Sequence, residues 1–115
     1  MKTTIVITAL LLALTVSMSE AMELQVWVTR YTKYECPNEH MASGRHPYVG
    51  AVAVSWDLEH RQGIKLGDTM TIDGKDYRVE DRTSRRLRRT VDIFTTTIRE
   101  ALHWGRQKKE VEVCR

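Results

Sequence analysis

The sequence predicts a mainly β protein, a small barrel of about six short strands with one or two short helices. Two observations lead to this fold class. Short runs alternate between apolar and polar residues, as half-buried strands do, and turn residues separate these runs. A run with helical spacing of its apolar residues appears near the end of the chain. Many short strands in a chain of 115 residues are typical of a small barrel.

Alternation places the strands, and a hairpin is the clearest local signal. Residues 68–81 contain two alternating runs on either side of Asp73-Gly74, a pair typical of a two-residue hairpin turn. Residues 33–50 are polar and carry both prolines, which predicts a long loop, and such loops in compact domains are often functional. The remaining strands are predicted at residues 23–32, 51–56, 90–94 and 110–114.

Helical patterns are confined to two segments. Residues 57–63 fit one helical turn with Asp57 as its N-cap. Residues 95–105 fit a longer helix, which a threonine would cap at its start and Gly105 would end. One face of this helix would carry Ile98, Ala101 and Leu102.

The N-terminus has the pattern of a secretory signal peptide. A positive charge precedes the apolar run 5–16, and Ser19 and Ala21 supply small residues at the −3 and −1 positions of a cut after Ala21. The run is short for a transmembrane helix, so a retained membrane anchor is the less favoured alternative. We therefore expect a signal peptide at residues 1–21, a mature domain at 22–115 and a secreted or periplasmic protein.

Charge and cysteine content fit an exported domain. The net charge of +3 favours an anionic surface such as a cell wall, but it is too small to indicate nucleic acid, and no nucleic-acid-binding motif is present. Cys36 and Cys114 form an even set, which in an oxidising compartment predicts a disulfide worth about 4–5 kcal/mol in the chain-entropy model. Two cysteines alone make a poor zinc site, and the histidines lack the spacing of metal ligands, so no metal is expected. No cofactor is expected either.

Two aspartates are the strongest candidates for chemistry. Asp81 and Asp92 lie eleven positions apart, each next to residues typical of strands, although aspartate is a poor strand former. Val91 and Ile93 are expected to face the core, so Asp92 points the other way. If the two strands are neighbours, the carboxylates approach each other and one has a raised pKa, as a general acid requires. In the preceding strand Tyr77, Val79 and Asp81 are expected to share a face.

The segment between these aspartates is rich in arginine. In the alternative interpretation, Asp81 caps this loop and Asp92 pairs with one of its arginines. Such an ion pair would lower the pKa of the Asp92 carboxyl. Arginines at this density are typical of a solvated surface loop, and they also suit phosphates or the carboxylates of wall peptides. The arginines are residues 82, 85, 86, 88 and 89.

The sequence resembles the 3D domain, a family named for three aspartates that adopts a double-psi β-barrel. The resemblance covers nearly all of residues 26–113. Relatives include membrane-bound lytic transglycosylase A, the rare lipoprotein A family and spore-associated wall enzymes. The matching segments are VTRYTKYE, ASG, VAVSWDL, LGDTMTIDGKDYRVEDRTSRRLRRTVDIF and REALHWGRQKKEVEV.

The resemblance implies lytic transglycosylase activity on peptidoglycan. Such enzymes cleave the β-1,4 bond between N-acetylmuramic acid and N-acetylglucosamine without water, giving a 1,6-anhydro product. By position Asp92 resembles the acid/base, Asp81 resembles the neighbour that tunes it or holds substrate, and Asp57 would be the third aspartate. The alternatives are a non-catalytic wall-binding or expansin-like wall-loosening module and an exported inhibitor. We expect a monomer that acts on glycan strands, with substrate-binding candidates at Asp57, Tyr31, Thr83 and Arg86.

Overall fold

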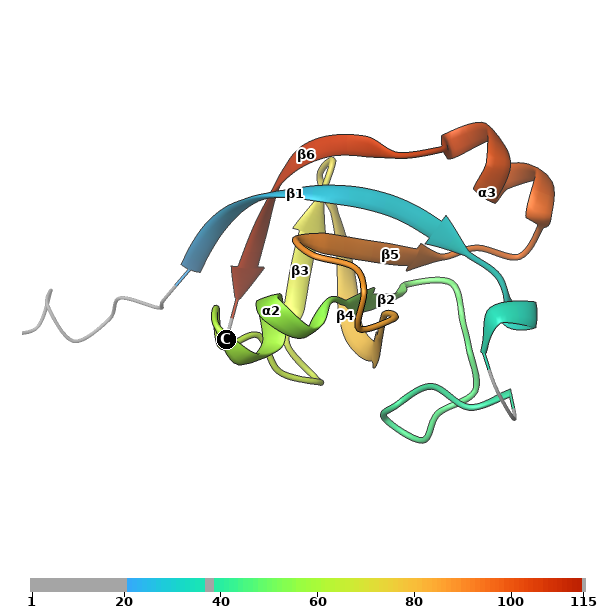
Figure 1. Ribbon diagram of the computed structural model, residues 1–115, viewed down its shortest axis with the longest axis horizontal. Coiled ribbons are helices and arrows are strands. Elements are labelled where there is room, and N and C mark those ends of the chain that lie inside the picture. Colours follow the sequence, from blue (N-terminus) through green and yellow to red (C-terminus); the bar gives the residue numbers. More distant parts are fainter. Residues whose placement is uncertain (1–20, 37–38, 115) are drawn as a thin grey trace, which may run out of the picture.

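The computed structural model of the 115-residue chain describes residues 21–36 and 39–114. This part of the chain is mainly β, as the sequence predicted, with six strands and two short α-helices (Figure 1). The elements are β1 (Ala21–Tyr31), the 3₁₀ helix η1 (Lys33–Glu35), β2 (Ala51–Val54), α2 (Trp56–His60), β3 (Thr69–Ile72), β4 (Lys75–Arg82), β5 (Thr90–Phe94), α3 (Ile98–Trp104) and β6 (Gln107–Cys114).

The strands close into a ring in the order β1-β5-β2-β4-β3-β6. Two pairs are parallel, β1 with β5 and β2 with β4, and the other pairs are antiparallel. The short strand β5 therefore lies between the first two strands of the chain, with β1 on one side and β2 on the other. This order depends on contacts between distant segments, so alternation within single strands did not predict it.

Alternating side chains divide the buried residues into two clusters. The larger cluster is rich in β-branched residues, including Val52 of β2 and Ile93 of β5, which suit a pleated surface. Their neighbours Ala53 and Phe94 belong to the second cluster, because successive side chains point to opposite faces. The second cluster is completed by Tyr31, Cys36, Met41 and Ala51, so the chain after β1 covers this face.

The hairpin and the caps of α3 are confirmed. Asp73 and Gly74 join β3 to β4 with φ of 51° and 77°, the left-handed values that this turn requires. The Thr97 side chain accepts a hydrogen bond from the Glu100 N–H at 3.2 Å, and Gly105 ends the helix at φ 67°. These local signals were sufficient because each involves only neighbouring residues.

The predicted cap of α2 is wrong by two residues. Ser55, not Asp57, is the N-cap residue, and Asp57 lies in the first turn. The helix begins early because β2 already ends at Val54. The Asp57 carboxylate instead accepts from the Ser55 hydroxyl at 2.6 Å and from the Arg89 N–H at 3.0 Å. This carboxylate therefore connects α2 to the arginine loop, the segment 83–89 between β4 and β5.

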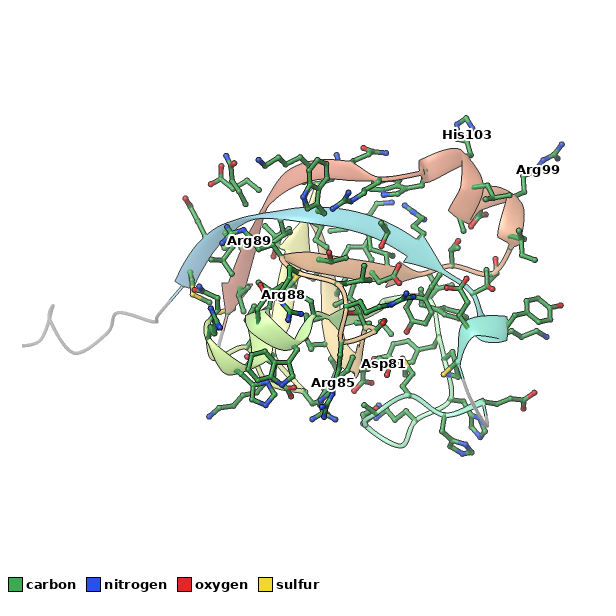
Figure 2. All side chains as sticks on the ribbon, viewed as in Figure 1. Asp81, Arg85, Arg88, Arg89, Arg99 and His103 are labelled. Carbon is green, nitrogen blue, oxygen red and sulfur yellow. The ribbon has the colours of Figure 1, made fainter. Side chains whose placement is uncertain are left out.

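Helix α3 attaches to the ring through its last residue. The indole Nε1 of Trp104 donates to the Val28 carbonyl at 3.0 Å, and the Arg30 guanidinium lies 4.2 Å from the Trp104 ring centre. The apolar face expected from the helical spacing is exposed, with 54% of Ile98 and 76% of Leu102 accessible to solvent. Figure 2 shows the neighbouring side chains Arg99 and His103 pointing outward from the same helix.

The predicted disulfide is wrong, because both cysteines are free. Cys36 is buried in the loop after β1, and its thiol donates to the His40 carbonyl at 3.1 Å. Cys114 is exposed and pairs with Ala21 at the start of the 11-residue strand β1. At about 3.3 Å per residue that strand holds the cysteines far beyond the ~7 Å between Cα atoms that a disulfide permits.

The predicted signal peptide falls on residues 1–21, of which 1–20 lie outside the described residues. Ala21 is the first residue of β1 and pairs with Cys114. In the described part of the chain, no helix is long and apolar enough to cross a membrane.

Candidate active site

The two aspartates lie on the same face of the sheet, one strand apart. Ala53 of β2 is opposite Asp92 of β5 on one side and opposite Asp81 of β4 on the other. Thr29 of β1 is opposite Asp92 on its far side. The sequence predicted that the two carboxylates approach each other if β4 and β5 are neighbours. The two strands are not neighbours, because β2 lies between them, but both aspartates lie on the same face of the sheet as the small Ala53.

A β-bulge in β4 brings Asp81 to this face. Val79 is opposite Val52 and Asp81 is opposite Ala53, so two residues of β4 advance for one of β2 and Glu80 is the extra residue. The predicted common face is therefore confirmed for Tyr77 and Val79, which both contact the larger core cluster, and wrong for Asp81. Val79 points into the larger core cluster, whereas Asp81 lies on the opposite face with Ala53.

Asp92 is a largely buried carboxyl with a raised pKa. Burial raises the pKa of Asp92 to about 7, a hydrogen bond from Thr29 opposes this rise, and the charges of Glu35 and Asp81 add to it. The Thr29 hydroxyl donates to Oδ1 at 2.9 Å. A carboxyl that titrates near neutral pH is suited to general acid and base catalysis.

No arginine neutralises Asp92. Among the described residues, no basic nitrogen lies within 4.0 Å of its carboxylate. The Arg88 guanidinium instead donates to the backbone carbonyls of Arg85 and Leu87, at 2.5 and 3.1 Å. The alternative in which Asp92 pairs with an arginine is therefore contradicted.

Asp81 accepts hydrogen bonds from three donors. The backbone N–H groups of Ala42 and Arg82 lie 3.0 and 2.9 Å from Oδ1, and the Tyr31 hydroxyl lies 3.3 Å from Oδ2. Tyr31 is 4% exposed, and its ring meets Phe94 edge-on with the centroids 5.6 Å apart. Burial raises the pKa of Tyr31, and the charge of Asp81 raises it further, so its hydroxyl stays a donor.

Glu80 holds the loop after β1 in place and was missed in the sequence. It is 2% exposed, and its Oε2 accepts from the Tyr48 hydroxyl at 2.6 Å. The exposed guanidiniums of Arg45 and Arg78 lie 3.6 and 3.5 Å from its carboxylate. The Glu80 carbonyl also accepts from the Ser43 N–H at 2.9 Å. A glutamate in an alternating run has no sequence signal that distinguishes this position from an exposed one.

Of the substrate-binding candidates Thr83 and Arg86, only Thr83 lines a cavity beside α2. Thr83, Trp56 and Arg85 line a cavity of about 390 Å³, in which Arg82 donates to both carboxylate oxygens of Glu59 at 2.9 and 3.0 Å. In Figure 2, Arg85 lies near α2 and Arg88 and Arg89 lie nearer the start of β5.

Asp57 does not join the carboxylate pair. Burial raises its pKa, but hydrogen bonds from Ser55 and Arg89 outweigh burial and lower it overall. Asp57 contacts the residue just before β5, whereas Asp92 lies in the middle of that strand. The described residues contain no group of three or more His, Cys, Asp or Glu side chains placed to hold a metal ion.

Comparison with known proteins identifies a shared fold. No family model matches the chain, and no curated protein matches it. One solved structure with a similar fold is the Streptomyces papain inhibitor, at 15% sequence identity and a TM-score of 0.54. The alignment covers 82% of this chain and 96% of that one. At this level of identity, the similarity places the chain in a β-rich fold that it shares with the Streptomyces papain inhibitor.

Proposed function

We propose that the protein is a secreted peptidoglycan lytic transglycosylase built on a double-psi β-barrel of the 3D-domain type, with Asp92 as its general acid and base. The observation that carries the proposal is the largely buried Asp92, whose pKa is raised to about 7 and whose carboxylate has no basic partner among the described residues. The parallel pairs β1–β5 and β2–β4 in the closed ring support the barrel assignment.

The proposed reaction needs one carboxyl that changes its protonation state. Protonated Asp92 gives its proton to the glycosidic oxygen while the bond from that oxygen to C1 of the muramic residue breaks. The Asp92 carboxylate then takes the proton of the C6 hydroxyl, whose oxygen bonds to C1 and closes the 1,6-anhydro ring. The proton count balances, no water is consumed, and Asp92 returns to its starting state.

Asp81 has a positioning role in this proposal. Its three hydrogen bonds fix Tyr31 and the loop residue Ala42 beside Asp92's face of the sheet. Its negative charge contributes to the raised pKa of Asp92. Thr29 orients the Asp92 carboxyl from the other side. This arrangement resembles the pairing of a tuned acid with a second, hydrogen-bonded carboxylate.

The test is mass spectrometry of the products released from purified peptidoglycan. The wild-type protein is compared with Asp92→Asn and with Asp73→Asn, a control in the hairpin turn, where asparagine is equally suited to the backbone. Anhydromuropeptides from the wild type and the control, but not from Asp92→Asn, would support the proposal. Products with ordinary reducing ends would indicate a hydrolase instead.

A second candidate function is a non-catalytic binding protein. The specific observation in its favour is that the Streptomyces papain inhibitor, whose name describes inhibition, is of similar size and fold. The exposed arginine loop would then supply the contact surface. Sedimentation with peptidoglycan without any released product would favour a wall-binding module, and inhibition of papain without wall binding would favour an inhibitor.

A further inference from the structure

Trp56 is an exposed aromatic ring that is held in a fixed position. It is the first residue of α2, and 37% of it is accessible to solvent. The His60 ring stacks on it, with the ring centroids 4.4 Å apart and the planes 14° from parallel. His60 is in turn positioned by its Nδ1, which lies 3.1 Å from the Trp56 carbonyl oxygen. Because His60 covers one face of the indole, the exposed part consists of the other face and the edges, on which a ring-shaped ligand can stack.

An ion pair beside this ring offers both hydrogen-bond donors and acceptors. Trp56 lines a cavity of about 390 Å³, which is within the usual range for small-ligand sites. On the cavity wall, Arg82 Nε donates to both carboxylate oxygens of Glu59 at 2.9 and 3.0 Å, and the Arg82 side chain is still 51% exposed. The hydrogen bond from Arg82 lowers the pKa of Glu59, so this carboxylate stays ionised. A guanidinium next to a carboxylate suits the hydroxyl groups of a ligand, because each hydroxyl both donates and accepts.

Arg85 adds a positive charge to the cavity that no acid in its wall balances. Two arginines line the cavity, Arg82 and Arg85, and the one acid in the wall, Glu59, is already paired with Arg82. Arg85 is exposed, and within residues 21–36 and 39–114 its guanidinium makes no hydrogen bond, ion pair or ring contact. Figure 2 shows Arg85 close to α2. A single guanidinium that solvent can reach suits a single carboxylate, whose two oxygens match its paired N–H groups.

We propose that this cavity binds a sugar ring that carries one carboxylate. The apolar face of the sugar lies against Trp56, because the electron-rich face of an indole attracts the polarised C–H groups of a pyranose. The hydroxyls of the sugar bond to the Arg82–Glu59 pair, and its carboxylate accepts from Arg85. A neutral sugar would leave Arg85 without a partner, and an aromatic acid would leave the ion pair unused.

The site is separate from the Asp92 carboxyl. Successive side chains of a strand alternate, so Arg82 points away from the face that Asp81 shares with Asp92 and towards Glu59 of α2. The inference concerns binding alone, so it does not depend on the proposed wall activity and holds equally for an enzyme and for a binding protein.

The chain contains a matched control for Arg85. Arg86 is the next residue, it is also exposed, and it is not among the residues that line the cavity. Loss of Arg86 therefore removes the same charge from the same loop without touching the proposed site.

The experiment is an NMR titration that follows the indole N–H signal of Trp56 in the full chain, with the signals of Trp27 and Trp104 as internal references. The probes are N-acetylmuramic acid and N-acetylglucosamine, which differ by the lactyl group that carries the carboxylate, and adenosine monophosphate. Neither sugar contains the glycosidic bond of the proposed reaction, so the result is independent of that reaction.

We expect a saturable shift of the Trp56 signal with N-acetylmuramic acid. N-acetylglucosamine should bind about threefold to fivefold more weakly, the usual size of an exposed charge contact. Arg85→Gln should bind the two sugars with equal affinity, whereas Arg86→Gln should keep the wild-type preference. The amide spectrum shows that each variant is folded, and Arg85 makes no contact on which the fold depends.

Several results would overturn the proposal. The absence of a saturable shift at Trp56 would exclude the stacking platform, and equal affinity of the wild type for the two sugars would exclude the carboxylate contact. A preference that survives in Arg85→Gln, or that is lost equally in Arg86→Gln, would contradict the role of Arg85. Tighter binding of adenosine monophosphate than of N-acetylmuramic acid would identify a nucleotide site instead.

Discussion

Asp81 and Asp92 lie opposite the same residue, Ala53, on the two strands that flank β2. Two spacings of about 4.8 Å between strands place their Cα atoms roughly 10 Å apart. At this separation the aspartates share a surface without sharing a proton, and the charge of Asp81 still contributes to the raised pKa of Asp92. Ala53 between them is 3% exposed, because it packs in the second buried cluster, which also contains Tyr31 and Phe94.

The raised pKa of Asp92 predicts a stability that falls as pH rises. Below about pH 4 the carboxyl is protonated in the folded and unfolded chains alike. Between pH 4 and about 7 the unfolded chain loses this proton and the folded protein keeps it, so each rise in pH favours unfolding. Above about pH 7 the loss is complete and amounts to at most about 4 kcal/mol.

The Asp92→Asn variant should lack this pH dependence. Its free energy of unfolding relative to the wild type is expected to increase from pH 4 to pH 7 and then to level off, in denaturant titrations at each pH. Asp73→Asn, which removes an exposed carboxylate paired with Lys109 at 2.9 Å, should not reproduce this relative increase between pH 4 and pH 7. A difference between Asp92→Asn and the wild type that stays constant with pH would contradict the raised pKa.

Thr29→Val should raise the pKa of Asp92 above its wild-type value of about 7. The Thr29 hydroxyl donates to the carboxylate and lowers its pKa, and valine keeps the shape of the side chain without the donor. The titration of the Asp92 carboxyl carbon by NMR measures the change. Thr71→Val removes the equivalent hydroxyl beside the exposed Asp76 and should leave Asp92 unchanged. An unchanged or lower pKa in Thr29→Val would refute the role of this hydrogen bond.

Asp57→Ala should destabilise the protein by about 1.5–3 kcal/mol, the usual range for hydrogen bonds to a charged group. The variant loses the acceptor for the Ser55 hydroxyl and the Arg89 N–H. Because the pKa of Asp57 is lowered in the folded protein, this contribution is present above about pH 4 and is lost on acidification. Faster hydrogen exchange at the Arg89 amide would locate the effect, and unaltered exchange there would argue against an anchor for the arginine loop.

Reducing agents should leave the melting temperature unchanged, because both cysteines are free. Thiol titration of the unfolded protein should find two thiols per chain. Cys114→Ser, at an exposed position, should alter the free energy of unfolding by no more than about 0.5 kcal/mol. A fall in melting temperature of several degrees on reduction would show that the cysteines are bonded after all.

The sequence was sufficient for features that depend on neighbouring residues. The strand at 90–94 was predicted with the bounds that the structure has, and the hairpin was predicted with its turn at Asp73-Gly74, because alternation and turn chemistry act within a few positions. The sequence also correctly predicted that Val91 and Ile93 face the core while Asp92 points to the opposite face, since Val91 and Ile93 are both core residues.

Features that depend on distant contacts were missed for physical reasons. The bulge at Glu80 arises from the pairing of β4 with β2, and without it Asp81 would face the core cluster with Val79. The predicted disulfide was wrong because it was inferred from the even number of cysteines and an oxidising compartment. In the structure Cys114 lies beside the start of β1 and Cys36 follows its end, so the length of the strand separates them. Arg30 follows a regular strand alternation, so the sequence did not indicate that its guanidinium stacks on Trp104 or that its Nε is buried.

The pairing of Ala21 with Cys114 joins the first and last described strands at one end of the ring, as the course of β1 and β6 in Figure 1 makes clear. A short flexible linker between these residues would therefore close the chain covalently with little strain. New termini could then be opened at the Asp73-Gly74 turn, between β3 and β4. The domain is thus a candidate for circular permutation, in which strand order along the chain changes while the neighbours of Asp92 stay the same.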